Sequence, residues 1–199
     1  MTRLVVLGAG GHAKVVADIA GRLGHEVAAY VDEHRAHTSA NMRGVAVVAG
    51  LDDVPGLPIA LGIGDNRARL SRLRAIAANG HEIMTLVHPS AVLASTVTLG
   101  TGVVVMAGVV VNSDVSVGDA AVLNTSCSID HDCAIGDGVH ICPGSHLAGG
   151  VTVGTGTFVG IGTNIIQLRN IGDWAVCGAG SVVVCDVPAR RTVKGSPAR

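Results

Sequence analysis

Length, composition and charge exclude several classes of protein. The chain has 199 residues, with 14 Lys and Arg against 15 Asp and Glu, so no strong field favours nucleic acid or an anionic membrane as a partner. Glycine occurs 28 times, whereas Trp, Tyr and Phe occur once each, so the core must consist of small aliphatic residues. Without a membrane-length apolar run or a signal segment, we expect a soluble cytoplasmic protein with no membrane insertion.

The first part of the chain alternates strand and helix patterns. Apolar runs predict strands at residues 4–7, 26–31, 58–63 and 82–87, and an amphipathic helix at 14–23. The segment "GIGDNRARLSRLRAIAANG" predicts a loop followed by a basic helix. Residues 1–87 are therefore interpreted as a βαβαβ half of a Rossmann-like dinucleotide-binding fold.

The loop "GAGGHA" raises the question of a nicotinamide cofactor. Gly8, Gly10 and Ala13 match the pattern G-x-G-x-x-A, and Asp32 ends the second predicted strand, which is a moderate signal for NAD. Half of the fold is too short for a dinucleotide, and no substrate domain for hydride transfer follows. NAD is therefore a minor alternative.

A half fold can still hold one nucleotide or a nucleotide-linked sugar, because helix N-termini present free amides to phosphate. Gly10, Gly11 and His12 begin the first helix, and Gly64 precedes the second, at the strand ends where α/β ligands bind. The alternative is that these glycines only form tight turns between strand and helix.

A strict six-residue repeat fills the second part, residues 88–199. Every sixth residue is apolar at sixteen consecutive positions: Leu93, Leu99, Val105, Val111, Val117, Leu123, Ile129, Ile135, Ile141, Leu147, Val153, Val159, Ile165, Ile171, Cys177 and Val183. Such a repeat predicts a parallel β-helix of triangular section, with three hexads in each 18-residue coil and about five coils stacked at roughly 4.8 Å.

The chain has five cysteines, an odd number, and no C-x-x-C motif, which disfavours a disulfide framework or a zinc site. They are Cys127, Cys133, Cys142, Cys177 and Cys185. We expect most of them to pack as small hydrophobic residues in the wall of the prism.

Three histidines lie on the outside of the predicted prism. His131 sits at a corner between Asp130 and Asp132, where neighbouring carboxylates favour a general base, although a solvated surface histidine fits equally well. His140 and His146 each precede an inward aliphatic residue and so point outward from a flat strand. His131 and His140 are nine residues apart, half a coil, and should lie on opposite sides of the prism.

These histidines could share a pocket only between subunits. An aliphatic outer face would suit a threefold oligomer with pockets in the grooves between prisms. The residues expected on that face are Val92, Val104, Val110 and Val122.

Four segments carry a family resemblance that covers nearly the whole chain. They are "GAGGHAKVVADIA" at 8–20, "IGDNRAR" at 63–69, "LNTSCSIDHDCAIGD" at 123–137 and "VKGSPAR" at 193–199. With the hexad repeat, the chain resembles the bacterial left-handed β-helix sugar acetyltransferases, in the branch that acetylates sialic acids or nucleotide-linked 4-amino sugars.

The resemblance implies a left-handed prism and a homotrimer that uses acetyl-CoA, with active sites between subunits and no metal. It places His131 on the catalytic base and Asp132 on the acid that makes the base stronger. It places the acetyl-CoA contacts on His140, Ile161 and Ala179, where Ala179 replaces a glycine of some relatives. It places the substrate contacts on Gly10, Gly11, His12, Asp32, Glu33 and Gly64.

Several functions remain open at this point. The leading hypothesis is N-acetylation of a nucleotide-linked deoxy amino sugar, and the runner-up is O-acetylation of a sialic acid. A non-catalytic scaffold that binds a nucleotide sugar is a different class, and a zinc enzyme would need His131, His140 and His146 to converge between subunits. A covalent acetyl-cysteine at Cys133 or Cys142 is disfavoured, because Cys133 occupies an inward wall position.

Overall fold

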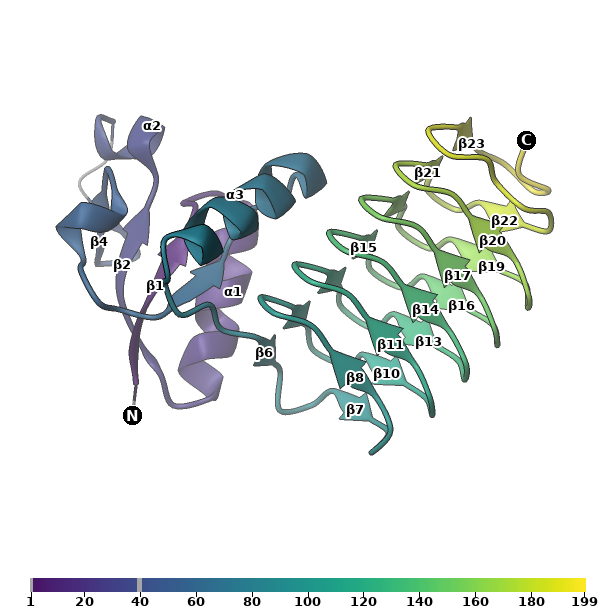
Figure 1. The fold of residues 1–199 in the computed structure, drawn as a ribbon, viewed down its shortest axis with the longest axis horizontal. Helices are drawn as coiled ribbons and strands as arrows, with labels where there is room; N and C mark the ends of the chain where they lie inside the picture. Colours follow the sequence, from purple (N-terminus) through teal and green to yellow (C-terminus); the bar gives the residue numbers. More distant parts are fainter. Residues whose placement is uncertain (1, 39–40) are drawn as a thin grey trace.

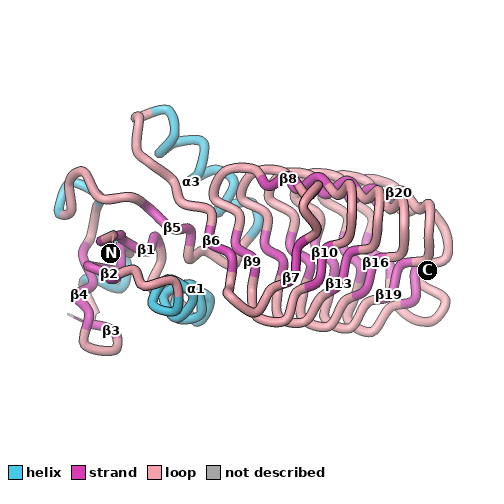
Figure 2. The backbone as a smooth tube through the Cα atoms, turned by 90° about the horizontal axis from the view of Figure 1, so that it is seen from below, coloured by secondary structure: helices cyan, strands magenta, loops and turns pink. Residues whose placement is uncertain are grey.

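The computed structural model describes residues 2–38 and 41–199 and shows two joined parts (Figure 1). An α/β domain forms the N-terminal part. A stack of short parallel strands forms the second part and ends at the C-terminus. Seen from below, the coils of this prism stack in one direction, with the α/β domain at one end (Figure 2).

The N-terminal domain contains one five-stranded sheet with the order β3-β4-β2-β1-β5. Its strands are β1 (Arg3–Leu7), β2 (Glu26–Val31), β3 (Asn41–Met42), β4 (Val45–Val48) and β5 (Ile59–Leu61). Its helices are α1 (Gly11–Arg22), α2 (Glu33–Ala36) and α3 (Asn66–Ala78), with a 3-10 turn at Leu51–Asp53. The inner strand β1 pairs in parallel with β2 and β5 and is buried on both faces, as its continuous apolar run predicts. Of the helices in the described ranges, none is both long and apolar enough to cross a membrane.

Several sequence predictions in this domain need correction. The first helix begins at Gly11 and not at residue 14, because Gly10 is already extended as its N-cap. The strand predicted at 58–63 covers only Ile59–Leu61, since Gly62 turns the chain toward α3. The strands β3 and β4 and the short helix α2 were not predicted. Their burial patterns are irregular and give no clear period.

The strand predicted at 82–87 is wrong as a member of this sheet. Ile83 makes only a single bridge to Ile59. The following strand, β6 (Leu86–Val87), pairs with β9 (Val104–Val105) of the prism, where the Leu86 amide donates to the Val103 carbonyl. The segment from Ile83 to Val87 therefore contacts the N-terminal sheet at its start and belongs to the prism at its end.

The prism has three parallel sheets of two-residue strands, consistent with a left-handed β-helix. The seven-stranded face contains β6, β9, β12 (Val122–Leu123), β15 (His140–Ile141), β18 (Phe158–Val159), β21 (Val176–Cys177) and β23 (Thr192–Val193). The six-stranded face contains β7 (Val92–Leu93), β10 (Val110–Val111), β13 (Ser128–Ile129), β16 (His146–Leu147), β19 (Asn164–Ile165) and β22 (Val182–Val183). The five-stranded face contains β8 (Thr98–Leu99), β11 (Ser116–Val117), β14 (Ala134–Ile135), β17 (Thr152–Val153) and β20 (Asn170–Ile171).

The predicted hexad repeat is confirmed by the pairing register. Val111 pairs with Ile129, and Ile129 with Leu147, so each residue lies beside the residue 18 positions further on. The second residue of each strand points inward and stacks on its neighbours along the axis. Four cysteines are buried, as predicted, and Cys185 is exposed.

Backbone with positive φ recurs at the corners. One row, which we call the docking corner, precedes the seven-stranded face; it consists of Gly102, Ala120, Gly138, Gly156 and Trp174. At Gly156 any other residue would be strained by the left-handed backbone conformation, and its side chain would also collide with the Trp174 ring.

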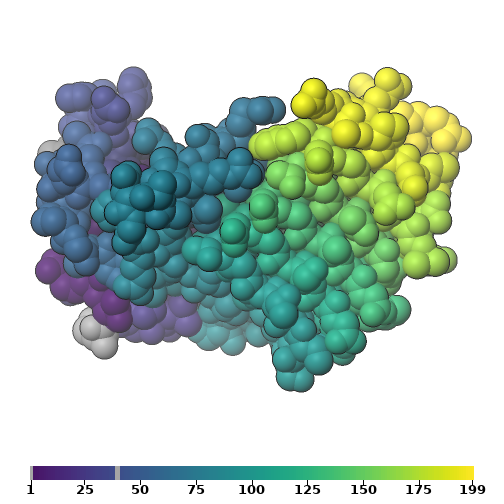
Figure 3. Space-filling view, in the orientation of Figure 1, coloured from purple at the N-terminus to yellow at the C-terminus, as the bar shows by residue number. Residues whose placement is uncertain are grey.

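The N-terminal domain packs along the docking corner and the seven-stranded face, in direct contact with the coils (Figure 3). Leu61 and Leu73 lie against Gly102, and Leu70 lies against Gly138. The Arg67 guanidinium lies 4.3 Å from the centre of the Trp174 ring. The helix α3 thus spans successive coils.

This packing corrects the expected aliphatic outer face. Val104 and Val122 are fully buried beneath the chain's own N-terminal domain. Val92 and Val110 lie on the six-stranded face and are 63% and 38% exposed. The four valines occupy two faces because positions 92 and 104 are two hexads apart, so they do not form a single free surface.

Substitution of Gly156 by Ala should destabilise the prism more than the same change at Gly144. Both residues have φ near +65°, so each alanine costs about 1–2 kcal/mol in backbone strain. Only Gly156→Ala adds a collision with Trp174, since nothing lies within 4 Å of a side chain at Gly144. Urea unfolding of both variants measures the difference, and equal midpoints would contradict the packing.

Candidate active site

Two glycine-rich loops meet at the carboxyl edge of the sheet. The helices α1 and α3 follow the neighbouring strands β1 and β5, so their N-termini lie side by side. A Cβ on Gly62 would lie 2.6 Å from Val6 and 2.8 Å from Ala13, so this approach requires glycine. A Cβ on Gly64 would lie 3.8 Å from the Cβ of His12. The structure therefore brings together His12 and Gly64 as the sequence predicts.

Gly10 and Gly11 lie on the same edge. Gly10 is the extended N-cap of α1, and Gly11 is its first residue. The first amides of α1 have no side-chain cap, whereas Asp65 Oδ1 caps α3 by accepting from the Ala68 amide at 2.8 Å. The uncapped N-terminus of α1 therefore favours a negatively charged group such as phosphate.

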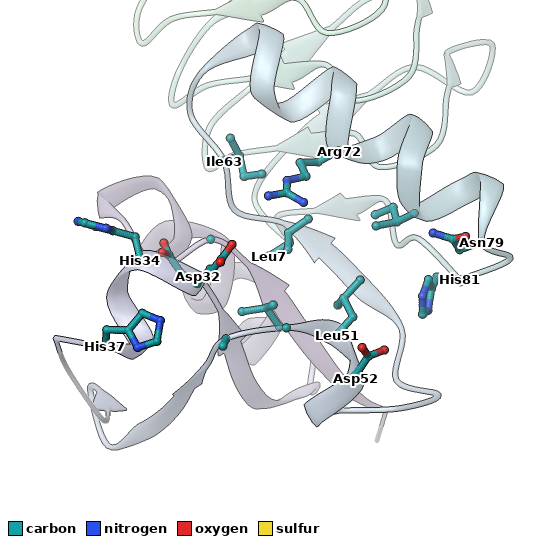
Figure 4. Close-up of a pocket in the computed structure, with 16 residues that line it drawn as sticks. Leu7, Asp32, His34, His37, Leu51, Asp52, Ile63, Arg72, Asn79 and His81 are labelled. Carbon is teal, nitrogen blue, oxygen red and sulfur yellow. The ribbon is translucent and has the colours of Figure 1, made fainter.

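A cleft of about 810 Å³ adjoins these loops at the ends of β1, β2 and β5 (Figure 4). Asp32 and Glu33 line it, together with side chains that the sequence analysis did not single out: His34, His37, Asp52, Arg72, Asn79 and His81. Figure 4 shows Arg72 on α3 on the opposite side of the cleft from Asp32, whereas the His34 side chain points away from Arg72. The basic pattern of "RARLSRLR" was the one available signal for Arg72.

Asp32 braces the first glycine loop. Its Oδ2 accepts a hydrogen bond from the Ala9 amide at 3.0 Å, and its Oδ1 accepts from the Arg35 amide at 3.0 Å, capping α2. Glu33 is the first residue of α2 and is exposed. Asp32 therefore shapes the loop as well as lining the cleft.

His140 lies beside His12 and not on a free surface. The two ring centres are 6.1 Å apart, and the ring centres of His140 and Phe158 are 5.4 Å apart in an edge-to-face arrangement. We call His12, His140 and Phe158 the aromatic wall. His140 points outward from its strand as predicted, but the N-terminal domain covers it and leaves it 8% exposed.

The two histidines of the aromatic wall are neutral near pH 7. Burial, with the charge of Arg69 as a second cause, lowers the pKa of His12 to about 4 and that of His140 to about 3. His140 Nε2 lies 2.9 Å from the Asn124 side-chain nitrogen. His12 Nε2 and His140 Nδ1 are buried and have no hydrogen-bond partner among the described residues. Where the two parts of the chain meet, each ring thus has one nitrogen that is enclosed and without a hydrogen bond to any described residue.

His131 and Asp132 form a pair at the corner between the six-stranded and five-stranded faces. His131 Nδ1 lies 2.7 Å from Asp132 Oδ2, and the two side chains are 61% and 65% exposed. Asp132 adopts a left-handed conformation with φ of 61°, which directs its carboxylate back to the preceding imidazole. A Cβ on Gly149 would lie 2.6 Å from the His131 ring, so glycine leaves the ring its place.

Asp130 completes this cluster from the other side. Its Oδ1 accepts from the His131 amide and from Asn112 Nδ2, both at 2.9 Å. The hydrogen bond to Asp132, followed by the charge of Asp130, raises the pKa of His131 above its usual value. With Nδ1 facing a carboxylate, Nε2 is the nitrogen that can take a proton from a substrate.

Other predicted residues lie elsewhere on the prism. Ile161 and Ala179 are exposed and stand one coil apart at the corner between the seven-stranded and six-stranded faces, where the Gly180 amide donates to the Ile161 carbonyl. His146 lies on the six-stranded face, with Nδ1 2.8 Å from Ser128 Oγ. Within residues 2–38 and 41–199 no group of three His, Cys, Asp or Glu side chains could hold a metal ion.

Cys133 and Cys142, the two cysteines considered as acetyl carriers, do not present a nucleophile. Burial raises the pKa of Cys133, and raises that of Cys142 to about 12. Both thiols therefore stay protonated near neutral pH. Cys133 also donates a hydrogen bond to the Ala148 carbonyl at 3.3 Å.

Within one chain the two halves of the site are apart. The glycine loops and the aromatic wall lie over the seven-stranded face. The corner with His131 is opposite that face in the triangular section, because the other two sheets meet there. A ligand in the loops of one chain therefore faces away from His131 of the same chain.

Comparisons with known proteins cover the whole chain. Residues 3–76 match a family described as the PglD N-terminal domain. A mutant perosamine N-acetyltransferase from Caulobacter crescentus, with a histidine replaced by asparagine and in complex with CoA and GDP-perosamine, is 40% identical; the match covers 100% of this chain and 96% of that one, with a TM-score of 0.94.

A second solved structure is the acetyltransferase domain of PglB from Neisseria gonorrhoeae in complex with acetyl coenzyme A. It is 35% identical, and the match covers 99% of this chain and 98% of that chain, with a TM-score of 0.93. A comparison with curated protein sequences gave no significant match.

Substitution of Asp132 by Asn should lower the pKa of His131. The hydrogen bond to the carboxylate is the largest cause of the raised pKa, and asparagine tolerates the left-handed backbone at this position. NMR titration of the His131 ring measures the change. Asp130→Asn serves as the matched control, with a smaller fall, and a larger fall in the control would contradict the assignment of Asp132.

Proposed function

This chain belongs to the PglD-like family of hexapeptide-repeat sugar N-acetyltransferases, and we propose that it transfers acetyl from acetyl-CoA to the 4-amino group of a nucleotide-linked deoxy amino sugar. The observation that carries the proposal is the full-length likeness to an enzyme that binds CoA and GDP-perosamine. The exposed His131–Asp132 pair supports it, because the reaction needs a base for the amine.

The proposed chemistry follows from the positions of the side chains. His131 Nε2 takes a proton from the 4-amino group as the nitrogen attacks the thioester carbon, and Asp132 stabilises the imidazolium. The carbonyl oxygen gains negative charge, which the free nitrogen of His140 or a backbone amide stabilises. The carbon–sulfur bond then breaks as the amide forms, and the imidazolium returns its proton to the CoA thiolate.

The binding roles divide between the two parts of the chain near residue 87. We assign the nucleotide sugar to the N-terminal domain, through Gly10, Gly11, His12, Asp32, Glu33 and Gly64, because the uncapped N-terminus of α1 and the cleft meet there. We assign acetyl-CoA to the prism, through His140, Ile161 and Ala179. His140 touches His12 and would therefore lie where sugar and acetyl group meet.

A second copy of the chain completes the proposed site. His131 lies opposite the face that carries the glycine loops, so the base must come from a neighbouring subunit. A triangular prism suits a cyclic homotrimer with three equivalent grooves. We further propose a cytoplasmic location, because both co-substrates belong to that compartment and all five cysteines are free.

Acetyl transfer is tested by release of free thiol from acetyl-CoA. GDP-linked and UDP-linked 4-amino-dideoxy sugars are compared with free and CMP-linked sialic acids. Turnover of an amino sugar is expected, and His131→Ala should lower kcat by 10²–10⁴-fold because the base is lost.

The panel separates the competing functions. Turnover of sialic acid alone would replace N-acetylation by O-acetylation. Binding of a nucleotide sugar without any turnover, equal in wild type and His131→Ala, would favour the non-catalytic scaffold.

Complementation tests whether sites lie between subunits. His131→Ala and His12→Ala should each be inactive alone, since one lacks the base and the other lacks part of the sugar site. After co-expression, each mixed trimer should hold one intact site, which gives roughly a quarter of the wild-type rate for random assembly. Activity that stays at the level of the separate variants would place each site within one chain.

A further inference from the structure

Arg69 is a buried cation in the described structure, and it belongs to none of the groups assigned above. It lies on α3, is fully buried, and makes hydrogen bonds without a carboxylate partner. Burial lowers its pKa to about 10, with Asp65 opposing, so it stays charged at neutral pH. Burying a charge is costly unless its hydrogen bonds are satisfied.

The guanidinium joins the two sides of the candidate sugar site. On the domain side, Nη1 donates to the carbonyls of Ile63 and Gly64 at 3.2 and 3.0 Å. On the prism side, Nη2 donates to Gly138 and Val139 at 3.0 and 3.3 Å. These last two residues directly precede His140, so one side chain holds both the second glycine loop and the start of β15.

Nε adds a third attachment. It donates to the Ala120 carbonyl at 2.7 Å, one coil before Gly138 on the docking corner. Because the fork of a guanidinium is planar and rigid, these acceptors fix its orientation.

Asn66 extends this contact by one more coil. Its Oδ1 accepts from Arg69 Nη2 at 2.9 Å, and its Nδ2 donates to the carbonyls of Gly156 and Thr157 at 3.1 Å. Thr157 directly precedes Phe158. Asn66 and Arg69 therefore hold the backbone that precedes His140 and Phe158. Arg69 also holds the second glycine loop, which lies beside His12.

We propose that Asn66 and Arg69 are positioning residues of the sugar site, which set the aromatic wall against the second glycine loop. The identity of the substrate in this inference rests on the proposed function. The role of Asn66 and Arg69 in setting His12 against His140 rests on the geometry alone. Neither residue needs to touch the reacting atoms. A displacement of about 1 Å in such a site can cost up to a hundredfold in rate.

Arg69→Lys and Arg69→Met separate geometry from charge. Lysine keeps the cation but has three donors on one nitrogen, so it cannot span acceptors on both sides. The KM for the nucleotide sugar should rise at least tenfold in both variants, with a much smaller change in the KM for acetyl-CoA. Asn66→Ser should show the same split in a milder form.

Arg67→Ala is the matched control on the same helix. Arg67 is exposed, and it attaches α3 to the prism only through Trp174. Its loss should lower Tm and leave the KM for the sugar unchanged. If the KM for the sugar instead follows Tm across all four variants, Asn66 and Arg69 only brace the domain and the proposal is overturned.

Titration of the ligand-free protein distinguishes failure of this inference from failure of the proposed function. The charged group from α3 that faces His12 and His140 is Arg69, and the two imidazoles face each other from α1 and β15. NMR signals of both rings should titrate at higher pH in Arg69→Met than in Arg67→Ala, since a nearby positive charge is removed. If the pKa values of both rings are the same in the two variants, Arg69 does not lie beside His12 and His140, and the proposal is overturned. If the pKa values differ but no amino sugar is turned over, the position of Arg69 stands and only the proposed acetyl transfer is refuted.

Discussion

The positions on the prism are set by the stacking of residues 18 places apart, a spacing that shortens to 16 places only in the last coil. The backbone hydrogen bonds run from coil to coil, and the inward aliphatic residues fill the axis without interruption. Insertion or deletion of one residue within a strand would turn the side chains that follow in that strand to the opposite face. The locations of His131, His140 and the docking corner all depend on this register.

The same register explains why the prism could be predicted from sequence. Sixteen apolar residues at one fixed interval leave one arrangement that buries them all, and the observed pairing agrees. The first glycine loop was also recognised from the sequence, through the G-x-G-x-x-A pattern of Gly8, Gly10 and Ala13, whereas the tight contact at Gly62 emerged only from the structure. Local patterns with a single physical solution were predicted well.

The parts that were missed depend on contacts between distant segments. Nothing near Val104 or Val122 in the sequence shows that another domain covers them, so they were assigned to an outer surface. His140 follows the outward pattern of its strand, yet its environment is set by His12, 128 positions earlier. In the sequence Arg69 looks like one more cation on a basic helix. Its role could not be predicted because its partners are backbone carbonyl groups, which every residue has.

The nucleotide signal at the N-terminus was informative once its context was known. A G-x-G-x-x-A loop alone suggests a dinucleotide, but the helix N-terminus that it creates recognises phosphate in general. In the proposed function the same loop binds the phosphates of a nucleotide sugar, in line with the full-length likeness to a sugar N-acetyltransferase.

At each row of corners with positive φ, the direction in which a side chain points and its height along the prism are set separately. Asp114, Asp132, Gly150 and Leu168 share one direction around the prism and differ only in height. Moving a side chain by 18 positions shifts it roughly 4.8 Å along the axis and leaves its direction unchanged. A fold of this kind can adjust the height of a reactive group to the length of its substrate by exchanging residues between coils, without altering the backbone.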